Sequence, residues 1–91
     1  MKRDMKIVRL ILEAAESYSE NIQVPRAFIY DTVIEKLGTE NPNNDLILYN
    51  IILLIDNGYL YDYDSAYNVT LRLTWDGHDL LDKLRKEDKV S

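Results

Sequence analysis

Two stretches in the C-terminal half decide the fold, Ile55-Asp-Asn-Gly-Tyr-Leu60 and Leu71-Arg-Leu-Thr-Trp-Asp-Gly-His-Asp-Leu80. Gly58 in the first stretch is typical of a helix end, because glycine readily adopts the left-handed conformation that ends many helices. The second stretch begins with the apolar alternation of a strand and then places a threonine, a common N-cap, before a helical pattern. Together they predict a helix ending near Gly58, a two-stranded hairpin, and a final helix that begins after Thr74.

The predicted hairpin comprises residues 59–64 and 69–74, joined by a loop around residues 65–68. Alternation places three tyrosines on one face of the first strand: Tyr59, Tyr61 and Tyr63. Packing of these rings across the hairpin, against β-branched residues or Arg72, is the simpler interpretation. The alternative is an aromatic platform for a base or a peptide. Asp62 and Asp64 argue against a nucleic-acid platform, since such platforms are flanked by cations.

Helical patterns upstream predict three more helices. Asp4 is placed to cap a helix over residues 5–18, and residues 21–24 are expected to form a turn or a short extended piece. A second helix is predicted over residues 26–37, with Gly38 as its stop, although the strand propensity of several residues there leaves a strand as the alternative. Asn43 or Asn44 would cap the third helix, which ends at Gly58.

This order of elements is that of a winged-helix domain with a C-terminal helix, and it predicts a mainly α, α+β fold. The 91 residues suit one domain, over residues 1–91, with one modest core. Structural roles are assigned to five positions around the hairpin and the last helix: Gly58, Leu73, Thr74, Trp75 and Gly77. The indole of Trp75 is expected to be largely buried where the hairpin meets the helices, because large aromatic side chains usually pack.

Composition excludes several classes of function. The chain has no cysteine, which rules out disulfides, zinc sites with cysteine ligands and thiol chemistry. The N-terminus lacks the uncharged stretch of a signal peptide, and the longest apolar run is too short to cross a bilayer, so a cytoplasmic protein is expected. The only histidine, His78, lies beside acidic residues that point elsewhere on a helix, so a structural or solvated role is favoured. Neither an enzyme nor a cofactor or metal site is predicted.

Charge is distributed unevenly along the chain. Residues 1–9 hold four basic and one acidic residue, residues 10–64 hold two basic and ten acidic residues, and residues 65–91 hold five of each. The middle segment contains the third helix, which would be the recognition helix of a winged-helix protein, and this helix has no basic residue. Phosphate binding needs Lys and Arg on the docking face, so the usual footprint of DNA binding is absent there.

The third helix has more apolar residues than one buried face requires. At 100° per residue, Ile47, Ile51, Leu54 and Ile55 share the predicted inward face, whereas Tyr49 and Ile52 fall on the outward face between Asp45 and Asp56. Candidate contacts with a partner are therefore Tyr49, Ile52, Tyr61 and Tyr63. If nucleic acid is bound instead, the candidate basic surface comprises Lys2, Arg3, Lys6, Arg9, Lys83, Arg85 and Lys86.

Three stretches resemble an uncharacterised family of short bacterial and bacteriophage proteins: Met1-Lys-Arg-Asp-Met5, Leu53-Leu-Ile-Asp-Asn-Gly-Tyr-Leu60 and Leu71-Arg-Leu-Thr-Trp-Asp-Gly-His-Asp-Leu-Leu-Asp82. The resemblance implies a winged-helix-like fold and a phage or prophage setting, but no activity. The chain departs from the family at Tyr49-Asn50, where the family often has Tyr-His, and in residues 24–44, where a shorter extended segment is typical.

The sequence favours a non-catalytic protein-interaction or regulatory module whose partner is a protein or a second copy of the chain. The acidic surroundings of the outward apolar residues suit a basic or apolar partner. The alternative is a DNA-binding transcriptional regulator of the winged helix-turn-helix type, which fold analogy alone supports. A membrane partner or a small-molecule substrate is not predicted.

Overall fold

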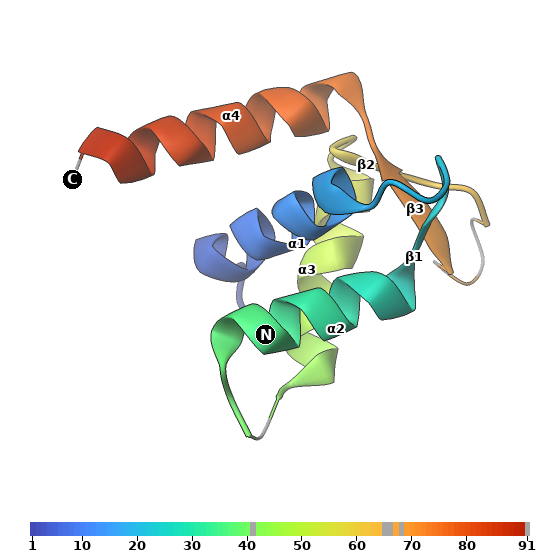
Figure 1. The fold of residues 1–91 in the computed structure, drawn as a ribbon, viewed down its shortest axis with the longest axis horizontal. Helices are drawn as coiled ribbons and strands as arrows, with labels where there is room; N and C mark the ends of the chain where they lie inside the picture. Colours follow the sequence, from blue (N-terminus) through green and yellow to red (C-terminus); the bar gives the residue numbers. More distant parts are fainter. Residues whose placement is uncertain (41, 65–66, 68, 91) are drawn as a thin grey trace.

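The computed structural model describes residues 1–40, 42–64, 67 and 69–90, and it has a mixed α+β architecture (Figure 1). Helices gather on one side of the molecule and a small antiparallel sheet lies at one end of them. The elements follow in the order α1 (Met5–Ser17), β1 (Val24–Pro25), α2 (Arg26–Leu37), α3 (Asn44–Asp56), β2 (Leu60–Asp62), β3 (Thr70–Leu73) and α4 (Trp75–Val90).

Helix α1 is the centre of the packing. It lies between α2 and α4, and α3 runs behind it (Figure 1). The predicted cap is confirmed, since the Asp4 carboxylate accepts hydrogen bonds from the backbone N–H groups of Lys6 and Ile7 at 3.0 and 3.2 Å. The inward face of α1 is fully apolar and buried: Ile7, Val8, Ile11, Leu12, Ala14 and Ala15. This stripe provides the surface on which the other three helices pack.

Residues 26–37 form a helix, which decides between the two possibilities that the sequence leaves open. Ile29 and Val33, one turn apart, are buried against the core. Gly38 ends the helix in the left-handed conformation, with φ of 63°, and its N–H donates to the carbonyl of Ile34 at 3.1 Å. The stop at Gly38 is therefore confirmed.

The predicted hairpin is confirmed, since β2 and β3 pair antiparallel. The sheet also has a third strand that the sequence does not predict, which gives the order β1-β3-β2. The third strand is β1, in the segment that the sequence leaves as a turn or an extended piece. Val24 pairs with Leu71 and Pro25 with Thr70, and the Arg26 N–H donates to the Val69 carbonyl at 2.8 Å. A strand of two residues has no alternating pattern to detect. Pro25 is tolerated because β1 is an edge strand.

Of the two predicted caps for α3, the structure selects Asn43, whose side chain accepts a hydrogen bond from the Leu46 N–H at 3.0 Å. The predicted inward face is largely confirmed, since Ile47, Ile51 and Leu54 are buried and Ile55 is half-buried. The chain leaves α3 through Gly58, which adopts φ of 79°.

Asn50 is a feature of α3 that the sequence does not reveal. It is 0% exposed and is the only buried polar or charged residue among those that the structure describes. Its Nδ2 donates to the Leu46 carbonyl at 2.9 Å and its Oδ1 accepts from the Asp4 N–H at 3.0 Å. Both ends of the amide are thereby satisfied, as a buried polar group requires. Asn50 thus joins α3 to the residue that caps α1.

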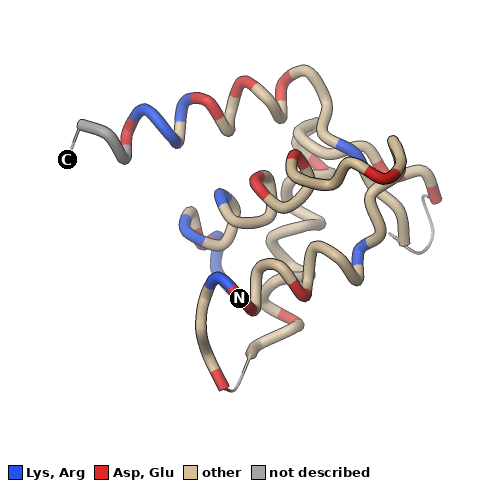
Figure 2. Tube along the Cα trace, in the orientation of Figure 1, with Lys and Arg blue, Asp and Glu red and all other residues tan. Residues whose placement is uncertain are grey.

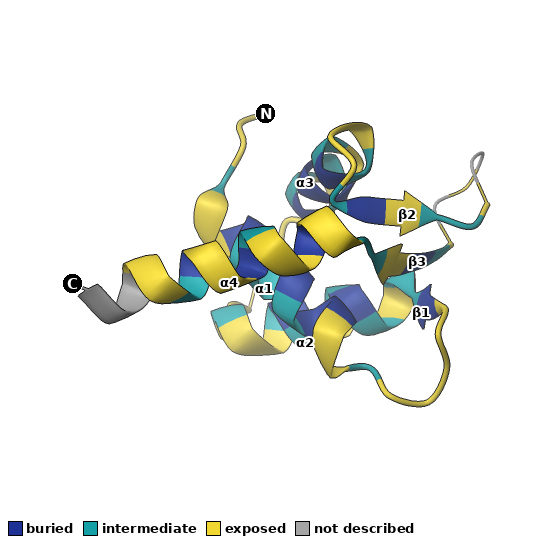
Figure 3. Cartoon of the chain, turned by 90° about the horizontal axis from the view of Figure 1, so that it is seen from above, coloured by how far each residue is buried: buried dark blue, intermediate teal, exposed yellow. Residues whose placement is uncertain are grey.

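Helix α4 lies over α1, with most of its outer surface exposed (Figure 3). Gly77, Leu81 and Leu84 form its buried stripe. None of the helices in the described part of the chain is both long enough and apolar enough to cross a membrane.

Candidate functional site

The outward face of α3 is formed by the residues that the sequence predicts. Ile52 is 36% exposed and Tyr49 is half-buried, and the carboxylates of Asp45 and Asp56 are exposed on either side along the helix. The exposed part of the Ile52 side chain is apolar surface in contact with water, which is unfavourable unless another surface covers it. This face therefore presents an aliphatic side chain and a phenol in an acidic setting.

The tyrosines of the hairpin form a compact stack with an arginine from the neighbouring strand. Tyr61 pairs with Arg72 across the sheet, and the Arg72 guanidinium lies 4.7 Å from the centre of the Tyr61 ring and 6.0 Å from that of Tyr63. The two rings meet edge to face, with centroids 5.1 Å apart. The simpler interpretation, packing across the hairpin, is confirmed. Since Tyr61 is still 43% exposed, the stack also offers an aromatic edge to solvent.

The turn into α4 is built by residues with clear structural roles. The Thr74 hydroxyl donates to the Gly58 carbonyl at 2.6 Å, and its oxygen accepts from the Gly77 N–H at 3.0 Å. The predicted N-cap is confirmed, and it also connects the end of α3 to the start of α4. Gly77 packs against the backbone of Tyr59 with no room for a Cβ. Leu73 is half-buried and pairs with Leu60.

Trp75 contradicts the prediction of a largely buried indole. It is 84% exposed and is the most exposed large apolar residue among those described. The reason lies in helical geometry. The buried stripe of α4 runs through Gly77, Leu81 and Leu84, and Trp75 lies about 200° around the helix from Gly77. The small glycine therefore faces the core while the indole faces water.

An open groove lies beside the first turn of α4, with a volume of about 460 Å³. It runs between the end of α1, the segment before β1, and the junction of β3 with α4. Its lining includes Tyr18, Ile22, Leu73 and His78, and Ile22 is 75% exposed. His78, which lines the groove, lies three positions after Trp75 on α4, although Trp75 itself is not part of the lining. Exposed apolar side chains from two parts of the chain thus occur around the start of α4.

The residues of the predicted basic surface divide into those with an ion pair and those without one among the residues that the structure describes. Arg85 makes two hydrogen bonds to the Glu16 carboxylate, at 2.7 and 3.1 Å, and approaches Glu13 at 3.6 Å. Arg9 lies 3.4 Å from Glu13. The hydrogen bonds from Arg85 lower the pKa of Glu16 and in turn raise the pKa of Arg85. The remaining predicted basic residues are exposed: Lys2, Arg3, Lys6, Lys83 and Lys86.

Figure 2 shows most Lys and Arg residues on the side where α1 begins and α4 ends. The two basic clusters predicted from the sequence therefore lie on the same side of the molecule. One cluster lies just before α1 and on its first turns, and the other lies on α4, whereas α3 contributes no basic residue. The same two helices also carry acidic residues, such as Glu13 and Glu16 on α1 and Asp79 and Asp82 on α4, whereas the charged residues of α3 are all acidic.

Comparison with known proteins identifies the family to which the chain belongs. The hypothetical-protein family DUF2513, a domain of unknown function, matches residues 2–89. No curated protein matches the chain, and no solved structure does so either. Because the match extends over nearly the whole chain, the protein belongs to the DUF2513 family.

Proposed function

We propose that this chain is a winged-helix-like, non-catalytic protein-interaction module. The order α1-β1-α2-α3-β2-β3, with β3 between the other two strands, is compatible with the winged-helix arrangement and supports that part of the proposal. In that arrangement α3 occupies the position of a recognition helix. The phage or prophage setting expected from the sequence belongs to the same proposal.

The observation that carries the proposal is the outward face of α3. A helix that docks into a major groove needs cations to neutralise phosphates. Here the exposed residues of that face are Asp45, Ile52 and Asp56, with Tyr49 half-buried among them. Phosphates would be repelled by this face, whereas a basic or apolar protein surface would find complementary charge and apolar contact.

The exposed indole of Trp75 is a second reason to favour a protein partner. Trp is enriched among the residues that dominate binding energy at protein interfaces. A tryptophan that contributes little to the core of its own chain, with the exposed Ile22 on the lining of the adjoining groove, fits such an anchor. We propose that both α3 and the start of α4 take part in binding, whether to one partner or to two.

The alternative function, a DNA-binding regulator, draws on one observation. The exposed cations near the start of α1 and on α4 lie on the same side of the molecule (Figure 2). Nucleic acid could be contacted there without α3 entering a groove. Such contacts would involve phosphates and would not read sequence.

A binding experiment separates the two functions. Anisotropy titration against a labelled random-sequence duplex is expected to show binding no tighter than the generic non-specific range of about 10⁻⁴ to 10⁻⁶ M at physiological salt. Submicromolar, salt-sensitive binding would contradict the proposal and favour the regulator.

A capture experiment tests the interface directly. The immobilised chain is exposed to a lysate of its source cells beside the variants Ile52→Asp and Trp75→Ala, with Tyr67→Ala as a matched control for an exposed aromatic residue. Light scattering of the same proteins detects self-association. A partner or dimer lost in either variant but kept in the control supports the proposal. A partner retained by both variants would exclude α3 and Trp75 from the interface.

A further inference from the structure

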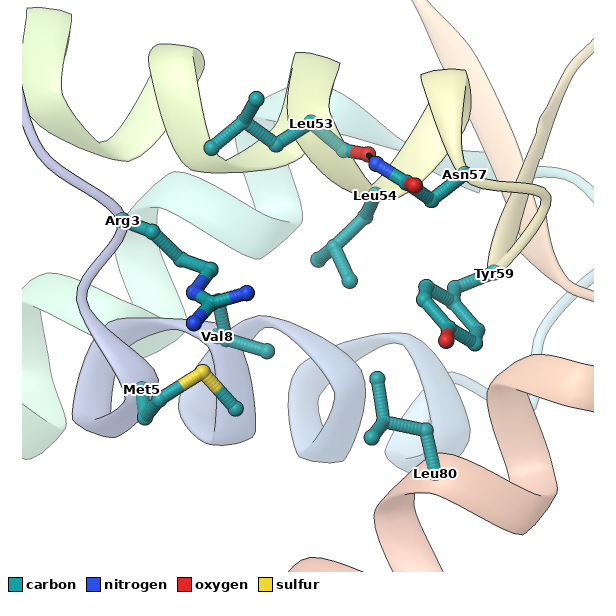
Figure 4. A pocket seen from close by; sticks show the side chains of 8 residues that line it. All are labelled: Arg3, Met5, Val8, Leu53, Leu54, Asn57, Tyr59 and Leu80. Carbon is teal, nitrogen blue, oxygen red and sulfur yellow. Dashed lines mark hydrogen bonds between the residues drawn. The ribbon is translucent and has the colours of Figure 1, made fainter.

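A small pocket opens where the start of α1, the end of α3 and the first half of α4 meet (Figure 4). Its volume is about 170 Å³. The floor is apolar, formed by Val8 of α1, Leu54 of α3 and Leu80 of α4. Met5, which is 41% exposed, lies at the rim. The pocket thus combines apolar side chains from three helices that are far apart in the sequence.

Three polar side chains line the pocket: Arg3, Asn57 and Tyr59. The Asn57 amide nitrogen donates to the Leu53 carbonyl at 2.8 Å, and the other two groups are directed into the apolar space. In Figure 4 the Arg3 guanidinium points between α1 and α3, over Val8, and the Tyr59 hydroxyl points inward from the opposite side. Among the residues that the structure describes, neither group has a hydrogen-bond or ion-pair partner. A guanidinium beside an apolar floor matches a carboxylate attached to a single apolar group.

The position of Arg3 is supported by the fold. The next residue, Asp4, caps α1 and donates its N–H to the buried Asn50. The backbone that carries Arg3 is therefore held against α3. Ordering of the backbone in advance reduces the entropy lost when the side chain binds an anion.

We propose that this pocket binds a small monocarboxylic acid with one apolar group, such as an aromatic ring or a short branched chain. The carboxylate accepts hydrogen bonds from Arg3, and the apolar group occupies the space over Val8, Leu54 and Leu80. The size agrees, because an engineered apolar cavity of about 150 Å³ accepts benzene. A single ring fits this pocket, whereas a fused two-ring acid exceeds it.

Benzoate is the probe for the test. In an amide NMR titration of the full chain, we expect saturable shifts at Val8, Leu54 and Leu80, with no shift of the indole N–H of Trp75, which does not line the pocket. Benzamide keeps the ring but lacks the charge, and acetate keeps the charge but lacks the ring. Benzamide loses the charge-assisted hydrogen bond, which discriminates by about tenfold or more, and acetate loses the apolar contact of the ring, so both are expected to bind more weakly than benzoate.

Two variants assign the polar contacts. Arg3→Gln is expected to weaken benzoate binding about tenfold or more, whereas Lys2→Gln, a matched loss of a neighbouring exposed charge, leaves it unchanged. Tyr59→Phe removes only the hydroxyl, which the proposal does not place against the carboxylate, so benzoate binding is expected to change less than it does in Arg3→Gln. Absence of saturable shifts at millimolar benzoate would overturn the proposal. So would equal binding of benzamide, or benzoate binding unaffected by Arg3→Gln.

Discussion

The α-carbon of Gly77 faces the backbone carbonyl oxygen of Tyr59 so closely that no side chain fits between them. At an open helical position, replacement of glycine by alanine raises stability by roughly 0.5–1 kcal/mol. At Gly77 the added methyl must displace backbone, so Gly77→Ala is expected to lower the free energy of unfolding by about 1–3 kcal/mol. Urea unfolding followed by circular dichroism measures the sign of this change in the free energy of unfolding. A variant more stable than the parent would show that the contact is absent.

The hydrogen bonds of the Thr74 hydroxyl predict that stability depends on a hydroxyl at the turn into α4. Thr74→Ala removes the hydrogen bonds to the Gly77 N–H and the Gly58 carbonyl. Loss of an N-cap costs roughly 0.5–2 kcal/mol. Thr74→Ser keeps the hydroxyl and is the matched control, which should melt close to the parent. Equal melting of both variants would contradict the capping role.

The exposure of Trp75 predicts that its removal leaves the fold nearly as stable as before. Surface substitutions usually change stability by less than about 0.5 kcal/mol, and Trp75→Ala and His78→Ala are both expected to fall in this range. Leu81→Ala, on the same helix but fully buried, should cost about 2–5 kcal/mol. Thermal melts compare the three variants. Severe destabilisation by Trp75→Ala would mean that the indole packs on the protein in solution.

The ion pair between Glu16 and Arg85 predicts a dependence of stability on pH. Because the hydrogen bonds from Arg85 lower the pKa of Glu16 in the folded chain, the unfolded chain binds a proton at this carboxyl more readily. The contribution is therefore complete above the ordinary glutamate pKa of about 4.3 and is lost as the pH falls through the lower folded value. Both side chains are about one-third exposed, so the contribution is small, about 0.2–1 kcal/mol.

Comparison of Glu16→Gln with the parent isolates this contribution. The variant is expected to be less stable at pH 7, and the difference should disappear in acid, below the pKa of the folded carboxyl. Chemical unfolding at both pH values measures it. A difference that persists in acid would have to come from packing of the side chain and not from its charge.

The buried amide of Asn50 predicts a larger effect on stability. Asn50→Ala removes the acceptor for the Asp4 N–H and leaves a small cavity under α3. An unsatisfied buried donor costs about 1–3 kcal/mol. The loss should appear in urea unfolding, and amide exchange at Asp4 should accelerate. Unchanged exchange at Asp4 would contradict the hydrogen bond.

Much of the fold follows from local sequence signals. Gly38, Asn43, Gly58 and Thr74 each mark a helix boundary through backbone chemistry that involves few residues, so the helices could be placed without knowledge of their partners. Strand β1 could not, because two residues carry no periodic pattern and its pairing with β3 depends on tertiary structure. The burial of Asn50 was likewise invisible, since it depends on Asp4, far away in the sequence.

The candidate site was predicted less completely. The outward position of Tyr49 and Ile52 follows from helical periodicity alone and is confirmed. The expectation that Trp75 is buried rests on its residue type and disregards the helical periodicity of α4. The spacing of Leu81 and Leu84 extends back to Gly77 and excludes Trp75 from the buried stripe, so the signal was present in the sequence. The pocket around Arg3 had no such signal, because its lining comes from separate helices.

The exposed indole of Trp75 also determines what optical spectroscopy can report. The chain has one tryptophan, and its ring is already in water in the folded protein. Intrinsic tryptophan emission should therefore change little on unfolding. An apolar surface that covers the first turn of α4 would instead shift the emission to shorter wavelength. The native chain thus carries a built-in fluorophore that follows association at α4 and is nearly insensitive to folding.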